Sequence, residues 1–156
     1  MKTKTKSLIV CIAIPLIVGA ISGFITMGSM ETFEQLNKPP LSPPGWLFPV
    51  VWTILFILMG IASYLVLVSG SPQRTIFAAL FVYAVQLAVN FFWSVFFFNM
   101  EWYLFSFFWL VCLWILILMT IILFSRASKP AAYLMIPYLL WVTFAGYLNL
   151  SIYFLN

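Results

Sequence analysis

The residues best suited to chemistry in this chain are amides, hydroxyls and indoles that recur at helical spacing in apolar surroundings. Gln86, Asn90 and Ser94 follow one another at intervals of four residues, beside Trp93. Residues spaced in this way share one face of a helix, and polar groups at membrane depth usually face the protein interior. The stripe predicts either contacts with a ligand or hydrogen bonds between helices, and the sequence leaves both open.

A second stripe lies near the C-terminus and is expected to face the first. It consists of Tyr138, Trp141, Ala145 and Asn149, which are three or four residues apart. The indoles of both stripes, together with Trp52, are suited to stacking on a flat hydrophobic molecule. Gln86 and Asn90 would then fix the orientation of such a molecule.

Several kinds of catalytic site are excluded by residue type. The chain has no histidine, so a His-ligated haem or zinc centre is ruled out. Cys11 and Cys112 both fall in apolar runs, which indicates neither a disulfide framework nor a metal site. The apolar runs hold no ionisable side chain of the kind that coupled transporters use. We therefore expect no required cofactor and no conventional acid–base enzyme.

Composition assigns the chain to the membrane. Of its 156 residues, 65% are hydrophobic and 6% are charged. A transmembrane helix needs about 20 mostly apolar residues, and five such runs are present, apolar on all sides rather than alternating as in a barrel strand. The runs cover residues 8–27, 47–68, 76–98, 103–124 and 131–155. The prediction is an all-α membrane protein in which residues 1–156 form a single five-transmembrane-helix bundle.

The first run also resembles a secretory signal peptide, because lysines precede it. It continues to Met27, however, and no Ala-x-Ala cleavage site follows. We interpret it as the first membrane helix, with a packing face at Gly19 and Gly23.

Charge placement predicts the topology. The basic residues at the N-terminus and in the second and fourth connections are Lys2, Lys4, Lys6, Arg74, Arg126 and Lys129. The first and third connections hold Glu31, Glu34, Lys38 and Glu101. The positive-inside rule then places the N-terminus in the cytoplasm, and the first loop and the C-terminus outside it. The lipid bilayer is the expected partner, and nucleic-acid binding has no support.

The longest polar break between the runs is rich in proline. Its prolines are Pro39, Pro40, Pro43, Pro44 and Pro49. Proline removes amide donors, so regular helix is expected only after Pro49, with Trp46, Phe48 and Trp52 at its mouth. Ser29 is expected to cap a short surface helix over residues 30–36. The break is either an extracytoplasmic lid over an aromatic pocket or a rigid connector with an interfacial aromatic belt.

Small residues mark the other face of the third run. Ala84 and Ala88 lie about 200° around the helix from the polar stripe. We expect them to mediate a homodimer.

Three motifs together resemble the TspO/MBR family, the tryptophan-rich sensory proteins and translocator proteins, also called peripheral-type benzodiazepine receptors. The first is Leu36-x-Lys38-Pro39-x-x-x-Pro43-Pro44-x-Trp46-x-Phe48 with Pro49 and Trp52. The second is Gln86-x-x-x-Asn90-x-x-Trp93-Ser94 with Phe97-Phe98. The third is Pro137-Tyr138-x-x-Trp141-x-x-Phe144-Ala145-x-x-Leu148-Asn149. Their order and spacing fit the family across nearly the whole chain.

The resemblance implies a bundle, often homodimeric, with a cavity under the first loop that binds protoporphyrin IX, haem-like tetrapyrroles or synthetic benzodiazepine-site ligands. By matched position the cavity residues would be Trp52, Asn90, Trp93, Trp141 and Ala145, and the lid residues Pro43 and Pro44. The implied protein resides in a bacterial plasma membrane and acts as a sensor, regulator or scavenger. The alternatives are light- and oxygen-dependent breakdown of protoporphyrin IX, with Trp52 and Trp141 as the reactive indoles, and transport of porphyrin or another small molecule.

Two departures from the family pattern stand out. Many members have Trp-Tyr before the loop and Trp ahead of the Pro-Pro pair, whereas this chain has Thr32-Phe33 and Leu41. The sterol motif of animal members needs a basic residue after tyrosine, and none follows Tyr147 or Tyr153.

Overall fold

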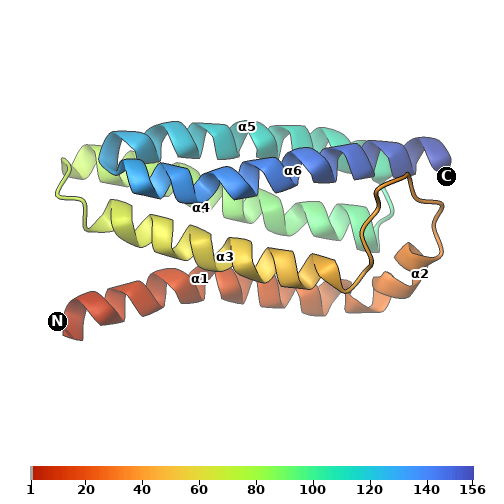
Figure 1. Cartoon of the computed structure of the whole chain (residues 1–156), viewed down its shortest axis with the longest axis horizontal. Coiled ribbons are helices and arrows are strands. Elements are labelled where there is room, and N and C mark those ends of the chain that lie inside the picture. Colours follow the sequence, from red (N-terminus) through yellow and green to blue (C-terminus); the bar gives the residue numbers. More distant parts are fainter. Residues whose placement is uncertain (1) are drawn as a thin grey trace.

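The computed structural model describes residues 2–156, and every regular element in that range is helical. Five helices are long and apolar enough to cross a membrane (Figure 1). They are α1 (Lys2–Thr26), α3 (Leu47–Leu67), α4 (Gln73–Ser94), α5 (Tyr103–Ala127) and α6 (Lys129–Leu155). The shorter elements are the 3-10 turn η1 (Met27–Ser29), the surface helix α2 (Met30–Glu34) and the π-turn η2 (Val95–Asn99). The predicted five-helix membrane bundle is confirmed.

The helix ends differ from the expected ones in two instructive places. Helix α3 begins at Leu47, before Pro49, because the first amides of a helix have no intrahelical acceptor and proline there breaks no bond. Helix α2 ends at Glu34, short of residue 36. Its expected cap is wrong as well, since the Ser29 hydroxyl donates to Asn99 Oδ1 at 2.7 Å instead of accepting from the α2 backbone.

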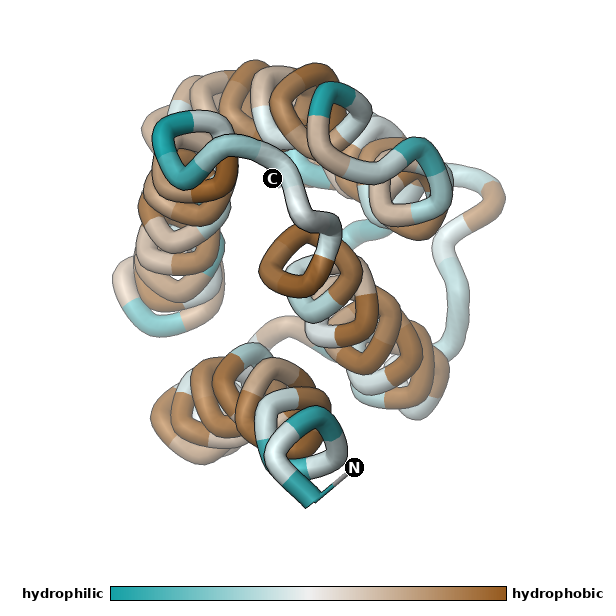
Figure 2. The backbone as a smooth tube through the Cα atoms, turned by 90° about the vertical axis from the view of Figure 1, so that its left-hand side faces the viewer, coloured by the Kyte–Doolittle hydropathy of each residue, from teal (hydrophilic) through white to brown (hydrophobic). Residues whose placement is uncertain are grey.

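The packing order places α1 at the edge of the bundle. Helix α5 lies between α4 and α6, α3 packs on α6, and α1 packs mainly on α3. Figures 1 and 2 show α1 on the opposite side of the bundle from α5 and α6. Within α1 only Pro15 and Thr26 are buried. The position of α1 therefore determines the size of the space between α1 and the other helices.

At Gly60 on α3 the backbones of α1 and α3 approach closely. A Cβ at Gly60 would overlap the backbone of Cys11 and Ile12 on α1. Gly19 on α1 makes the reciprocal contact, because a Cβ there would overlap the ring of Phe56. Small residues permit this crossing, as they do in other membrane helices.

The charges separate to the two ends of the bundle as predicted. The N-terminus, the α3–α4 connection and the α5–α6 connection lie together at one end (Figure 1) and carry six of the seven basic residues. Figure 2 looks onto this end, where hydrophilic segments cap hydrophobic helices. Helix α2, the α4–α5 connection and the C-terminus lie at the other end, with Glu31, Glu34, Lys38 and Glu101.

Candidate functional site

A cavity of about 870 Å³ lies between α1, α3 and α4, next to the loop that joins α2 to α3. Most of its wall is formed by residues between positions 16 and 26 on α1, Trp46 just before α3, residues between 48 and 56 on α3, residues between 90 and 94 on α4, and Phe98 on η2. The volume falls in the range of small-molecule sites. The cavity occupies the half of the bundle that lies nearer the acidic end.

The α3 wall is aromatic. Phe48, Trp52 and Phe56 follow at intervals of four residues and all line the cavity. Trp52 stacks on Phe56 with ring centroids 5.5 Å apart, and the buried Phe33 of α2 packs edge-on against Phe48 at 5.8 Å. Trp46 lies at the rim and is 67% exposed. Three residues predicted for the ligand site, Trp46, Phe48 and Trp52, are therefore together on this wall.

The α4 wall contains three more of the predicted residues. Asn90, Trp93 and Ser94 border the cavity, followed by Phe98. The Trp93 indole donates to Asn149 Oδ1 at 3.1 Å, which fixes the ring. This part of the polar stripe faces the cavity, so a ligand there would meet an amide, a hydroxyl and an indole.

The α1 wall was not predicted as part of the site. It consists of small and hydroxyl-bearing residues, among them Gly19, Ser22, Gly23 and Thr26. A Cβ at Gly23 would meet nothing within 4 Å, so this glycine borders open space rather than a packed helix. The recurrence of Ser22 and Thr26 at an interval of four was the available signal. In the sequence this face had been interpreted as a packing face only.

Two hydrogen-bonded links join α1 to the end of α4 and to η2 beside the cavity. The hydroxyls of Ser22 and Ser94 bond to one another. The Asn99 amide donates to the carbonyl of Ile25 at 3.2 Å. Both links lie in the second half of α1, next to the acidic end of the bundle.

The rest of the two polar stripes forms hydrogen bonds inside the bundle. The Tyr138 hydroxyl donates to Gln86 Oε1 and accepts from Asn90 Nδ2, both at 2.7 Å. Asn149 Nδ2 donates to the carbonyl of Tyr103 at 2.7 Å. The prediction that the stripe of α6 faces that of α4 is confirmed. Gln86, Tyr138 and Asn149 are almost fully buried and do not border the cavity.

Four other predicted residues lie close to the cavity without lining it. Trp141 packs edge-on against Phe48, with centroids 5.9 Å apart, and Ala145 is buried. Pro43 and Pro44 lie in the connecting loop, in which Gly45 is the residue that reaches the cavity. Contact between these residues and a ligand stays a prediction.

The loop between α2 and α3 is tied to the end of α6. Asn156 Oδ1 accepts from the backbone N–H of Asn37 at 3.1 Å, and Asn156 Nδ2 donates to the backbone carbonyl of Asn37 at 2.9 Å. The Tyr147 hydroxyl donates to the carbonyl of Pro40 at 2.9 Å. Figure 1 shows the loop reaching across to α6 before it returns to α3. The loop is thus fastened beside the cavity at defined points.

The chemistry of the cavity is that of a binding site. Among the described residues that line it, Glu34 at the rim is the only charged one. The remaining polar groups are hydroxyls, one amide and the indole rings. Such a wall can stack on and orient a flat hydrophobic molecule, and it offers no paired acid and base.

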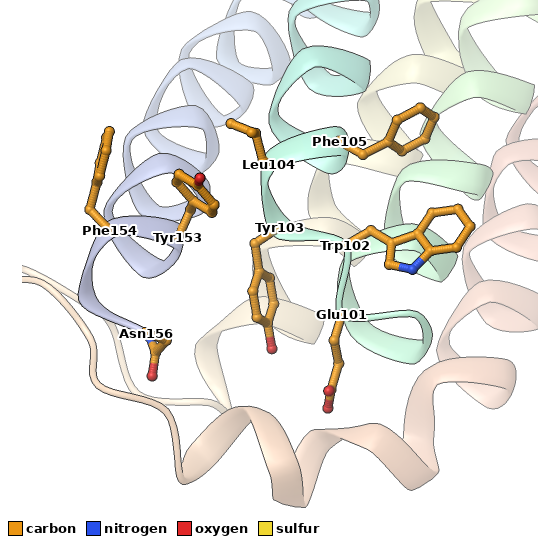
Figure 3. Close-up of a pocket in the computed structure, with 8 residues that line it drawn as sticks. All are labelled: Glu101, Trp102, Tyr103, Leu104, Phe105, Tyr153, Phe154 and Asn156. Carbon is orange, nitrogen blue, oxygen red and sulfur yellow. The ribbon is translucent and has the colours of Figure 1, made fainter.

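A second hollow, of about 690 Å³, lies where α5 begins and α6 ends (Figure 3). Its side chains diverge: Trp102 and Phe105 point to one side, and Tyr153 and Phe154 to the other. None of the predicted site residues lies in it. Because its side chains do not converge on a common volume, the cavity beside α1 is the better candidate.

The fold and the cavity define a multi-pass helical membrane protein with an aromatic cavity near one end. A family model described as "TspO/MBR family" matches residues 11–155, and the chain belongs to this family. It is 43% identical to the tryptophan-rich protein TspO of Chlorobaculum tepidum, over 100% of this chain and 99% of the relative. It is 37% identical to the tryptophan-rich sensory protein of Cereibacter sphaeroides, over 81% and 77%. It is 33% identical to the translocator protein of Bos taurus, over 87% and 82%.

Proposed function

We propose that this protein binds a porphyrin or a related haem-like tetrapyrrole in the cavity between α1, α3 and α4, and acts as a membrane sensor, regulator or scavenger. The observation that carries the proposal is the aromatic wall of Phe48, Trp52, Phe56 and Trp93 around a volume of about 870 Å³. Flat conjugated rings stack favourably on such side chains. The names of the relatives, which refer to sensing and translocation, agree with a ligand-binding role.

A dark titration with protoporphyrin IX tests the proposal through tryptophan fluorescence. We expect saturable quenching, with a smaller amplitude in Trp52→Phe. Trp114→Phe is the matched control, because the Trp114 indole donates to Thr143 on α6, outside the cavity. Absence of saturable quenching in the unsubstituted protein would contradict the proposal.

Illumination and sealed vesicles distinguish the binding role from its alternatives. Stable porphyrin absorbance under light supports a sensor or scavenger. Protein-dependent loss of the absorbance bands that requires Trp52 would favour photo-oxidative breakdown instead. Porphyrin flux across protein-containing vesicles would favour transport.

The proposed location is a bacterial plasma membrane, with the N-terminus in the cytoplasm and both the first loop and the C-terminus outside. The support is the concentration of basic residues at the end of the bundle that holds the N-terminus. Alkaline phosphatase fused after Asn156 should be active in cells. An inactive phosphatase together with a fluorescent green-fluorescent-protein fusion at the same site would reverse the orientation.

We also propose a homodimer through α4. Ala84 and Ala88 are exposed on the face of α4 that points away from the cavity. Small residues at this spacing allow two helices to approach closely. Ala84→Phe combined with Ala88→Phe should shift detergent-solubilised protein from dimer to monomer, and an unchanged size would place the contact elsewhere.

A further inference from the structure

One carboxylate lies at the rim of the cavity with no ion-pair partner among residues 2–156. Glu34 is the last residue of α2 and belongs to the cavity wall. Its Oε1 lies beside Gly45, close enough that a Cβ at Gly45 would be 3.2 Å away. Gly45 also borders the cavity. Glu34 is exposed, and its carboxylate lies near the loop at the rim of the cavity.

The nearest basic residue in the chain, Lys38, is engaged elsewhere. Its ammonium donates to the backbone carbonyl of Glu34 at 3.1 Å and lies 4.9 Å from the centre of the Phe33 ring. These two contacts hold the ammonium against the α2 backbone rather than against the Glu34 side chain. The charge of the Glu34 carboxylate is thus left available to a ligand.

The electrostatic environment of the entrance is negative. Glu31, Glu34 and Glu101 lie at this end of the bundle with Lys38, and the other basic residues lie at the opposite end. The ends are separated by the length of the helices, about 40 Å for a helix the length of α6. That distance exceeds the Debye length of about 8 Å at physiological salt, so the distant cations do not offset the carboxylates.

Aromatic rings line the part of the cavity formed by the start of α3. Trp46 and Phe48 border the cavity at the start of α3, and Trp52 follows one turn further in. Ring faces attract ammonium and other organic cations, tryptophan most strongly. A carboxylate together with several ring faces is the combination that recognises a cation attached to an apolar body.

We infer that the loop end of the cavity is a cation-selecting subsite, which takes flat hydrophobic ligands whose polar end carries an ammonium group. The inference rests on the proposed function, because it describes which ligands the same cavity prefers. A ligand with free carboxylates must turn them away from Glu34 or bind more weakly. The cavity thus discriminates among tetrapyrroles by the charge of their side chains.

The test uses three porphyrins with one ring system and different charge. They are protoporphyrin IX with its two propionates, its neutral dimethyl ester, and a bis-amide that carries two ammonium groups. Dark tryptophan quenching gives the affinity of each for the unsubstituted protein, Glu34→Gln and Glu31→Gln. Glu31 is the matched control, because it lies three residues away in α2 and does not border the cavity.

The expected result is a change that depends on ligand charge. Glu34→Gln should weaken the affinity for the bis-amide about fivefold, which corresponds to the upper value for a solvent-exposed ion pair. It should strengthen the affinity for protoporphyrin IX by a smaller factor and leave the affinity for the neutral ester unchanged. Unchanged binding of the ester also shows that the variant is folded. Glu31→Gln should change all three affinities by less than about twofold, and added salt should reduce the effect of Glu34.

Two results would overturn the inference, and only one of them would also overturn the proposed porphyrin binding. If Glu34→Gln leaves the bis-amide affinity unchanged, or changes all three ligands equally, the cation subsite is wrong while porphyrin binding stands. If none of the three porphyrins quenches the unsubstituted protein saturably, the proposed function and the subsite both fail.

Discussion

The two sides of α4 differ in what their polar groups do. Toward α6, Gln86 and Asn90 are joined by the Tyr138 hydroxyl through two bonds of 2.7 Å. Toward α1, Ser94 and the ring of Trp93 border a cavity whose far wall is made of small residues. The inner part of this polar stripe therefore joins helices, and its outer part forms a cavity wall, where contact with a ligand stays a prediction.

The back wall and the front wall of the cavity therefore differ in how they are attached to the bundle. The back wall, on α4, is held by buried hydrogen bonds to α6. The front wall, α1, is held by the close crossing at Gly60 and by a few bonds near its C-terminal end. Substitutions in the core should therefore affect stability first, and substitutions along α1 should affect binding first.

Gly60→Ala tests the attachment of the front wall and should have the largest effect on stability. The new Cβ would meet the backbone of Cys11 and Ile12, which cannot move without displacing α1. Overpacking costs about 1–3 kcal/mol, so we expect a lower unfolding temperature in detergent and porphyrin affinity weakened at least about fivefold. Gly146→Ala is the control, because its Cβ would lie 3.6 Å from Leu110, an ordinary contact. Equal behaviour of the two variants would contradict the crossing.

Tyr138→Phe tests the back wall. Without the hydroxyl, the amides of Gln86 and Asn90 lose their shared partner while buried. A buried polar group left without a partner costs about 1–3 kcal/mol of stability. Hydrogen bonds between membrane helices contribute free energies at the lower end of this range. Thermal unfolding should show the loss, and Tyr133→Phe should not, because Tyr133 is 66% exposed. A Tyr138→Phe variant as stable as Tyr133→Phe would remove the core network from the account.

Asn37→Ala tests the fastening of the loop and should have the smallest effect. The side chain of Asn37 donates to the carbonyl of Leu155, and its backbone pairs with Asn156. Exposed hydrogen bonds are worth about 0.5 kcal/mol, so we expect bound porphyrin to dissociate two- to threefold faster, roughly, in stopped-flow displacement. The exposed neighbour Gln35, replaced by alanine, provides the control. Identical dissociation rates would show that the loop does not limit escape of the ligand.

The helices and the inward-facing stripes could be predicted from the sequence. Apolar runs of about 20 residues have few alternatives in a chain with 6% charged residues. The spacing of Gln86 and Asn90 places both on one helix face, and their burial calls for hydrogen-bond partners; the Tyr138 hydroxyl pairs with Gln86 Oε1 and Asn90 Nδ2. The spacing and the polarity of these residues together predict the helices and their inward-facing stripes.

The front wall could not be predicted in the same way. Gly19 and Gly23 are equivalent by spacing, yet a Cβ at Gly19 would overlap Phe56, whereas one at Gly23 would enter open space. The distinction depends on the angle at which α1 crosses α3, which the composition of α1 does not encode. Spacing also does not show which ring of a contacting pair borders the cavity: Phe48 does, and Trp141 packs against it, so contact between Trp141 and a ligand stays a prediction.

The most direct test of the central claim is a comparison of porphyrin affinity between Gly23→Leu and Gly28→Leu. A side chain at either position meets no atom within 4 Å of its Cβ, so both variants should fold, but only Gly23 borders the cavity. We expect leucine at position 23 to occupy the binding volume and to weaken protoporphyrin IX binding about tenfold or more, equivalent to about 1.4 kcal/mol, whereas leucine at position 28 should have little effect. Equal affinities in two folded variants would contradict binding between α1, α3 and α4.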